Sequence, residues 1–184
     1  MAKFLDRLDD RLTDFIREQP MFFVATAPSR GRVNLSPKGM DTFRVLGPDH
    51  VGYLDLTGSG NETSAHILEN GRITLMFCAF DGPPNILRLY GTGSTILPSH
   101  HAFAEYISMF PEAPGVRQII LADIHKVQTS CGYTVPLYEY AGERDHAWKW
   151  VAKKGDDGLA QYRADNNITS MDGLPTALSI HQQE

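Results

Sequence analysis

Several features that mark other protein classes are scarce in this chain. Only two of its 184 residues are cysteines, Cys78 and Cys131, and their spacing matches neither a metal site nor a CxxC pair. No block of Lys and Arg occurs, and the formal net charge of -5 argues against a nucleic-acid partner. No apolar run has the length of a membrane span, and the first residues, MAKFLDRLDDRL, lack the apolar core of a signal peptide. We therefore expect a cytoplasmic protein that contacts neither nucleic acid nor membrane.

The usual catalytic motifs are missing as well. There is no GxSxG elbow, and no glycine-rich stretch ends in the Gly-Lys-Ser/Thr of a P-loop. His100, His101 and Glu105 lie close in sequence, but only one of the two histidines can share a helix face with Glu105 and no third ligand is evident. We expect no metal site, and no side chain stands out as a catalytic acid, base or nucleophile.

What the chain does contain is a series of short β-rich runs joined by turns. MFFVATA and RVNLS flank the turn PSRG, and TFRVL and VGYLDL flank the turn GPDH. Longer runs follow in RITLMFCAF, ILRLYGTGSTIL and RQIILADIHKVQTS, and the two glycines inside the second of these suggest a bulge or a bend. Six or seven strands with few helices predict a mainly β, antiparallel barrel rather than an alternating βαβ fold.

Helical patterns are confined to the ends and to two short segments. An amphipathic helix is expected over 4–17, a short one over NETSAHILEN with Gly71 just past its end, and another over roughly 100–110, capped by Ser99. The tail reads as two short helices broken at Gly155. We divide the chain into an N-terminal helix (1–20), a barrel (21–130) and a helical extension (131–184) that packs on the barrel or on a partner subunit.

The stretch DLTGSGNETSAHILENG joins an apolar strand to a helix through a loop rich in glycine and hydroxyl groups. Unpaired backbone N–H groups and the positive end of the helix dipole could hold a phosphate there. The GxGxxG fingerprint fails at Thr63, so the loop is not that of a dinucleotide fold. An equally simple interpretation is that Ser59 or Asn61 caps the helix and the glycines only form a turn.

A set of further stretches resembles one known family. NLSPKG, YLDLTGSGNETSAHILENGRITLMF and LRLYGTG, in this order and spacing over residues 20–130, resemble the pyridoxamine-phosphate oxidase-like flavoproteins, which are FMN-binding split barrels of Greek-key type. The later QTSCGYTVPLYEY and DGLP are similar to a subgroup with a C-terminal extension. The basic C-terminal motif of the true oxidases is missing from ALSIHQQE, so the resemblance is to the family and not to that enzyme.

The resemblance implies a cofactor site and a homodimer with FMN at its interface. In it Asn34, Ser36, Pro37 and Lys38 would line the flavin ring and ribityl chain, and Asp55, Leu56 and Thr57 would approach the ring from the next strand. Ser59, Asn61 and Thr63 would hold the phosphate. Because this loop is neutral where the better-studied oxidases use Arg and Lys, positive charge must come from elsewhere. The candidates are Lys38, Arg72 and Arg88.

The function that this resemblance implies is an FMN-dependent oxidoreductase that transfers a hydride or electrons to a small molecule. Lys38 is the candidate for stabilising reduced flavin, whose N1 and O2 edge carries negative charge. Two alternatives stay open: a relative that binds deazaflavin or haem, and a flavin-binding or storage protein without turnover. Fold alone does not separate them.

Overall fold

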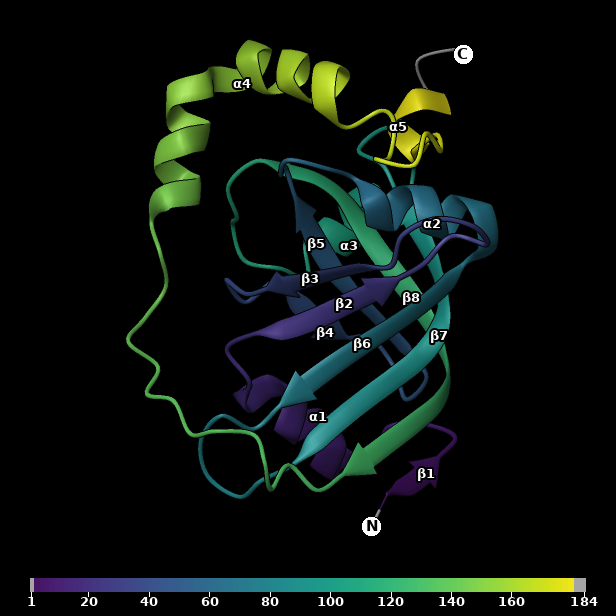
Figure 1. The fold of residues 1–184 in the computed structure, drawn as a ribbon. Helices are drawn as coiled ribbons and strands as arrows, with labels where there is room; N and C mark the ends of the chain where they lie inside the picture. Colours follow the sequence, from purple (N-terminus) through teal and green to yellow (C-terminus); the bar gives the residue numbers. More distant parts are fainter. Residues whose placement is uncertain (1, 181–184) are drawn as a thin grey trace.

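The computed structural model describes residues 2–180 as one curled antiparallel sheet with five helices around it (Figure 1). Seven strands follow the order β3-β2-β6-β7-β8-β5-β4, and β1 pairs with the far end of β8. The strands are β1 (Lys3–Leu5), β2 (Phe22–Thr26), β3 (Asn34–Lys38), β4 (Phe43–Val45), β5 (His50–Leu56), β6 (Arg72–Cys78), β7 (Ile86–Ile96) and β8 (Val116–Ser130). The helices are α1 (Asp10–Glu18), α2 (Glu62–Asn70), α3 (Phe103–Ile107), α4 (His146–Asn166) and α5 (Ala177–Ile180).

The strand pairing confirms the predicted mainly β, split-barrel fold. β2 and β3 form the first expected hairpin, with Thr26 opposite Asn34, and β4 and β5 form the second, with Val45 opposite Val51. The glycines of β7 also behave as predicted. The register with β8 shifts between Tyr90 and Gly91, and a Cβ on Gly91 would lie 2.4 Å from the Asp123 carbonyl oxygen. Only glycine allows the two backbones to approach so closely.

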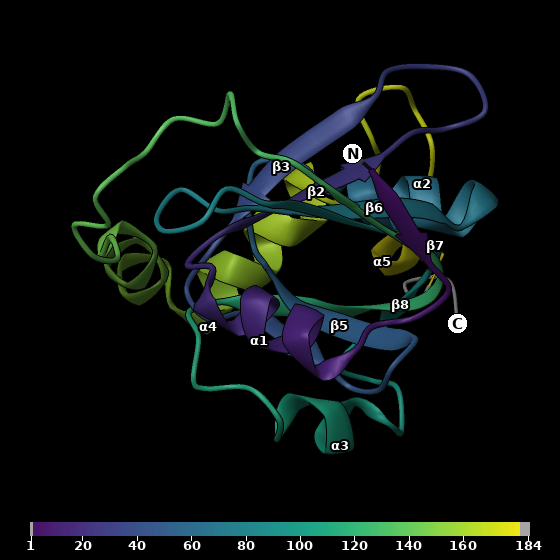
Figure 2. The same ribbon diagram turned by 90° about the horizontal axis from the view of Figure 1, so that it is seen from below.

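The core lies inside the curl of the sheet, and helices close its two ends. Leu12 and Ile16 of α1 and Ile67 of α2 belong to the same buried cluster as the inward residues of the strands. α3 packs elsewhere, on the outer side of β5 and β8, over a second cluster around Leu54 and Ile119 (Figure 2). No helix of residues 2–180 is long and apolar enough to span a lipid bilayer.

Two helix predictions require correction at their N-termini. The helix expected over 4–17 begins only at Asp10, because Asp9 is its cap and accepts a hydrogen bond from the Leu12 N–H at 2.8 Å. Residues 3–5 form β1 instead. The helix after Ser99 is α3, which begins at Phe103 and has Ala102 at its N-cap, so Ser99 does not cap it.

The end of α2 and the break in the tail are confirmed. Gly71 takes the left-handed conformation after α2, with φ 74°, and Gly155 interrupts α4 with φ 65° and ψ 176°. Residues 131–145 form an irregular strap that leads from β8 to α4, and α4 leads back to α2 (Figure 1). The division at residues 20 and 130 stays a prediction.

Candidate functional site

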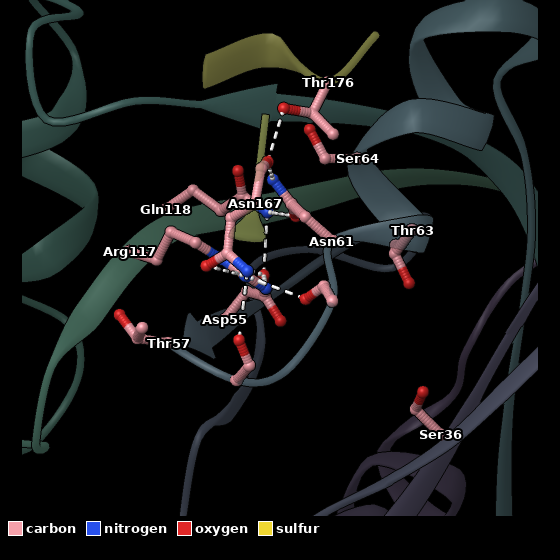
Figure 3. Close-up of polar contacts among 12 residues, drawn as sticks. Ser36, Asp55, Thr57, Asn61, Thr63, Ser64, Arg117, Gln118, Asn167 and Thr176 are labelled. Atoms are coloured by element: carbon pink, nitrogen blue, oxygen red, sulfur yellow. Dashed lines mark hydrogen bonds and ion pairs between the residues drawn. The ribbon is translucent and has the colours of Figure 1, made fainter. Parts of the chain in front are cut away.

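A buried acidic residue lies near the end of β5, where the strand enters the glycine-rich loop. Asp55 is 1% exposed and its carboxylate accepts hydrogen bonds from three side chains. Lys38 Nζ donates to Oδ1 at 3.0 Å, while Arg117 Nη2 and Gln118 Nε2 donate to Oδ2 at 2.6 and 2.7 Å. The donors come from β3 and β8, so one carboxylate ties three strands together. Figure 3 shows Asp55 with the two donors of β8.

The charge of Asp55 is stabilised by these neighbours. Burial alone would raise the pKa of the carboxyl group, because desolvation disfavours the ionised form. The cations of Lys38 and Arg117, together with their hydrogen bonds, outweigh burial and lower the pKa of Asp55 to about 2. Asp55 is therefore a carboxylate at neutral pH, and its lone pairs are already engaged.

A β-bulge explains how Arg117 reaches Asp55. The β5–β8 register pairs Asp55 with Gln118 but Leu56 with Val116, so Arg117 is left without a partner residue on β5. An extra residue of this kind bends the strand and redirects its side chain. The Arg117 guanidinium is consequently buried, at 3% exposure, and its Nη1 donates to the Gly60 carbonyl at 2.9 Å.

The loop itself presents a row of unused donors. Among the described residues, none of the hydrogen bonds begins at a backbone N–H of residues 58–64. This segment covers the last part of the loop and the first turn of α2, where the helix dipole is positive. Such an end can bind an anion without any charged side chain in the loop.

Asn61 is at the N-cap of α2 but does not cap it with its side chain. Its Nδ2 donates to the Asn167 carbonyl at 3.1 Å, and its Oδ1 accepts from Gln118 Nε2 at 2.8 Å. The simpler interpretation, in which the Asn61 side chain accepts a hydrogen bond from a backbone N–H of the first turn of α2, therefore does not describe this loop. Its side chain is buried and holds the loop in place, which leaves its backbone N–H as the group able to meet a ligand.

The C-terminal hook consists of residues 167–177, which follow α4 and pack against the loop. Asn167 is completely buried in it, and its Nδ2 donates to the Gly58 carbonyl at 3.0 Å. Its Oδ1 accepts from Arg117 Nη1 at 2.8 Å. Just before the hook, Arg163 of α4 donates through Nε to Thr57 Oγ1 at 2.9 Å. Burial and the nearby Arg117 cation lower the pKa of Arg163.

β3 presents three of the predicted residues toward the loop. Asn34 Nδ2 donates to Thr63 Oγ1 at 3.2 Å, Ser36 Oγ donates to Asn34 Oδ1 at 3.2 Å, and Lys38 reaches Asp55. Successive residues of a strand point to opposite faces, so Pro37 points away from this group. Figure 3 shows Ser36 and Thr63 on the same side of Asp55.

The structure separates the remaining predicted residues from this group or places them at its margin. Arg88 pairs in register with Met76 and Gln128, and its Nη1 donates to Ser130 Oγ at 3.2 Å, far along the sheet from the loop. Arg72 donates to the Ala27 carbonyl at 3.2 Å, beyond the C-terminal end of α2. At the margin of the group, Leu56 is partly buried, and the exposed Ser59 makes no hydrogen bond within residues 2–180.

Four residues of the group were not predicted from the sequence: Arg117, Gln118, Arg163 and Asn167. Arg117 carried a signal, because a lone charged residue before the apolar run IIL in a strand needs a buried partner. No local sequence pattern marks Arg163 or Asn167, because both residues contact a loop that lies about a hundred residues earlier in the chain. No group of three or more His, Cys, Asp or Glu residues within 2–180 is arranged to hold a metal ion.

Comparison with known proteins identifies relatives of this chain. The sequence model of the family described as pyridoxamine 5'-phosphate oxidase matches residues 8–131. A protein of Aspergillus flavus, named pyridoxamine 5'-phosphate oxidase family protein ustO, is 42% identical over 193 residues. That alignment covers 95% of this chain and 78% of the relative, so the similarity includes the C-terminal extension.

Solved structures share the fold at much lower sequence identity. HupZ of Group A Streptococcus is 19% identical with a TM-score of 0.53, over 65% of this chain and 91% of HupZ. A Clostridium acetobutylicum protein related to general stress protein 26 of Bacillus subtilis, of the pyridoxinephosphate oxidase family, is 13% identical with a TM-score of 0.51. That comparison covers 67% of this chain and 91% of the other. Both alignments leave about a third of the chain uncovered.

Proposed function

The chain belongs to the pyridoxamine 5'-phosphate oxidase family, and from this premise we propose that it binds FMN and uses it as an oxidoreductase. The observation that carries the proposal is the row of unpaired backbone N–H groups over residues 58–64, at the start of α2. The first N–H groups of a helix have no partner within the helix, and Gly58 and Ser59 at the start of this row are exposed, so an anion can reach the donors from solvent. A phosphate dianion has the charge and the oxygens to meet them.

The chemistry of the donor set fits a phosphate. Gly58 and Gly60 have no side chain, so the backbone at these positions can approach an anion closely. Thr63, in the first turn of α2, adds a hydroxyl group. The positive charge comes from behind the loop, where Arg117 binds the Gly60 carbonyl and Arg163 binds Thr57. In this proposal Ser59 contributes its hydroxyl and Asn61 its backbone N–H.

The flavin ring and ribityl chain are assigned to β3, whose Asn34, Ser36 and Lys38 face the loop. The Lys38 ammonium, fixed by Asp55, would be the positive group near the N1 and O2 edge that favours the reduced form. Leu56 and Thr57 would border the ring from the end of β5. A bound flavin would supply the hydride or electron transfer, while these residues bind it, orient it and set its electrostatic surroundings.

A flavin carrier without turnover is the alternative, and one observation favours it. The acid nearest the loop on β5 is Asp55, whose oxygens are taken up by Lys38, Arg117 and Gln118 and whose pKa is held at about 2. It therefore cannot exchange a proton with a substrate near neutral pH. A pure hydride acceptor needs no such group, whereas a reaction that must move a proton does.

We further propose a homodimer, in which a second copy covers the outer face of β3, β2 and β6. Residues directly opposite in paired strands share a face, so Leu35, Ala25 and Thr74 lie together, as do Pro37, Phe23 and Met76. Leu35 is 62% exposed on this face, whereas the outer face of β5 and β8 is covered by α3. Pro37 and Arg88 would then meet the partner subunit.

The test begins with the colour of the purified protein. A yellow protein that releases FMN on denaturation supports the proposal, a Soret band identifies haem, and uptake of deazaflavin but not FMN identifies the other cofactor. A colourless protein that takes up no FMN contradicts the proposal. The flavin-loaded protein is then mixed with NADH or NADPH without oxygen. Rapid bleaching supports an oxidoreductase, and colour that persists with many donors supports the carrier.

A further inference from the structure

The C-terminal hook holds the carbonyl side of the loop. Asn167 Nδ2 donates to the Gly58 carbonyl at 3.0 Å, and Arg117, which is itself bound to Asn167 Oδ1, donates to the Gly60 carbonyl at 2.9 Å. The two glycine carbonyls are thus both held by side chains of β8 and the hook, Arg117 and Asn167, which Figure 3 shows next to each other. Asn167 contacts one of them directly and positions the group that contacts the other.

Fixing these carbonyls also fixes the direction of the N–H groups. In a trans peptide the C=O of one residue and the N–H of the next point in opposite directions. Because the carbonyls of Gly58 and Gly60 point toward Asn167 and Arg117, the N–H groups of Ser59 and Asn61 point away from them. Glycine residues would otherwise leave these peptide planes free to rotate.

The hook is fastened at three further points, so that Asn167 is held in one position. Thr176 Oγ1 donates to the Asn167 carbonyl at 2.8 Å. The Met171 N–H donates to Glu62 Oε1 at 3.0 Å, and the Ala177 N–H donates to Ser64 Oγ at 3.1 Å. The last two contacts join the hook to the first turn of α2, the same turn that offers free N–H groups.

We propose that Asn167 is a positioning residue for phosphate recognition, through which the C-terminal extension orients the loop amides toward the phosphate of the cofactor. The inference rests on the proposed function, because it requires FMN in the loop. It assigns the extension a role in the site rather than only in covering the barrel. It also explains how a loop without Arg or Lys can bind a dianion, since the buried Arg117 cation and the Asn167 amide hold its carbonyls and the half-buried Arg163 cation binds Thr57 beside it.

The test compares FMN with riboflavin, which has the same ring and ribityl chain but no phosphate. Dissociation constants of both flavins are measured by fluorescence quenching on the full chain, on Asn167→Ala and on Asn166→Ala. Asn166 is the matched control, because it is exposed and its Nδ2 donates only to the Tyr162 carbonyl. Asn167→Ala should weaken FMN binding about tenfold, the equivalent of one or two hydrogen bonds, and change riboflavin binding less than about twofold. Asn166→Ala should change neither.

A milder variant guards against a folding defect. Thr176→Val keeps the side-chain volume and removes only the hydroxyl group that holds the Asn167 carbonyl, so it should reduce the preference for FMN in the same direction but less. The inference is overturned if either Asn167→Ala or Thr176→Val folds and keeps the wild-type ratio of the two affinities, or if both flavins weaken equally. A wild-type chain that binds neither flavin overturns the proposed function and this inference with it.

Discussion

Arg117 and Asn167 meet beneath the glycine-rich loop, where Arg117 Nη1 donates to Asn167 Oδ1 at 2.8 Å. The contact joins the barrel to the C-terminal extension at a buried position, and the Asp55 carboxylate pairs with the cation on its other side at 2.6 Å. Lys38 shares this carboxylate, so the three groups together keep a net positive charge. A buried cation shared in this way makes the loop depend on two distant parts of the chain.

The first prediction concerns acid stability. The pKa of Asp55 is about 2 in the folded chain, against 3.8 as its ordinary value, so the group stabilises the fold at pH values above about 4. That contribution, about 2 kcal/mol, should be lost as the pH falls from 4 toward 2. Between pH 4 and pH 2, the free energy of unfolding of Asp55→Asn should therefore fall less than that of the wild type. It should also lower the free energy of unfolding at pH 7 by about 3 kcal/mol, because Lys38 and Arg117 lose their counter-charge.

Urea unfolding at a series of pH values measures this effect. Asp14→Asn is the control, because Asp14 forms an exposed pair with Arg17 and such pairs contribute less than about 1 kcal/mol. If the free energy of unfolding of Asp55→Asn falls with decreasing pH as steeply as that of the wild type, the buried ion pair does not govern acid unfolding.

The second prediction concerns Thr63. Its Oγ1 accepts from Asn34 Nδ2, so its hydroxyl proton remains available for an acceptor such as phosphate. Thr63→Ala should weaken FMN binding about tenfold, as expected for the loss of one hydrogen bond to a charged group. Thr63→Ser should restore it. Calorimetric titration checks both variants, and equal FMN affinity in the alanine variant and the wild type would remove Thr63 from the phosphate site.

The fold was predictable because its signals are local. Alternation in FFVAT and NLSPK, the turn between them and the glycines of β7 each act within a few residues, and the structure confirms the hairpin and the bulge. β1 has only three residues and is stabilised by its pairing with β8 and by the packing of Leu5 on the core, so nothing local distinguishes it from the start of a helix. For the same reason the start of α1 was placed too early.

Only one part of the candidate site was predictable from the sequence, namely the part formed by the motifs of β3 and the glycine-rich loop. Asp55 and Arg117 are 62 positions apart, and their contact depends on a bulge in the β5–β8 register that no local pattern encodes. Asn167 acts on Gly58 over 109 positions. The position of Arg88 on the outer face was accessible, because the buried neighbours Leu87 and Leu89 require it to point the other way.

The third prediction concerns the reduction potential of the bound flavin. If the Lys38 ammonium lies near the N1 and O2 edge, Lys38→Met should lower the two-electron potential by about 30 mV, equivalent to about 1.4 kcal/mol of lost stabilisation of the anionic reduced form. Lys38→Arg should retain most of the wild-type potential. Dye-equilibrated titration measures the change, with the exposed Lys153→Met as a control. An unchanged potential in Lys38→Met would limit Lys38 to its ion pair with Asp55.

The fourth prediction concerns the second copy of the chain. Leu35 is exposed on the open outer face of the sheet, so Leu35→Glu should leave the isolated fold intact but place a carboxylate in the proposed interface. An unpaired charge buried between subunits is costly, and the variant should therefore elute as a single chain and bind FMN at least ten times more weakly. Met109→Glu is the control, because Met109 is 42% exposed in the segment after α3, away from this face.

Light scattering on both variants, with dilution of the flavin-loaded wild type, measures whether flavin binding depends on association of the two copies. Dilution should release flavin and separate the subunits together, and a single chain that retains FMN would contradict a site shared between two copies.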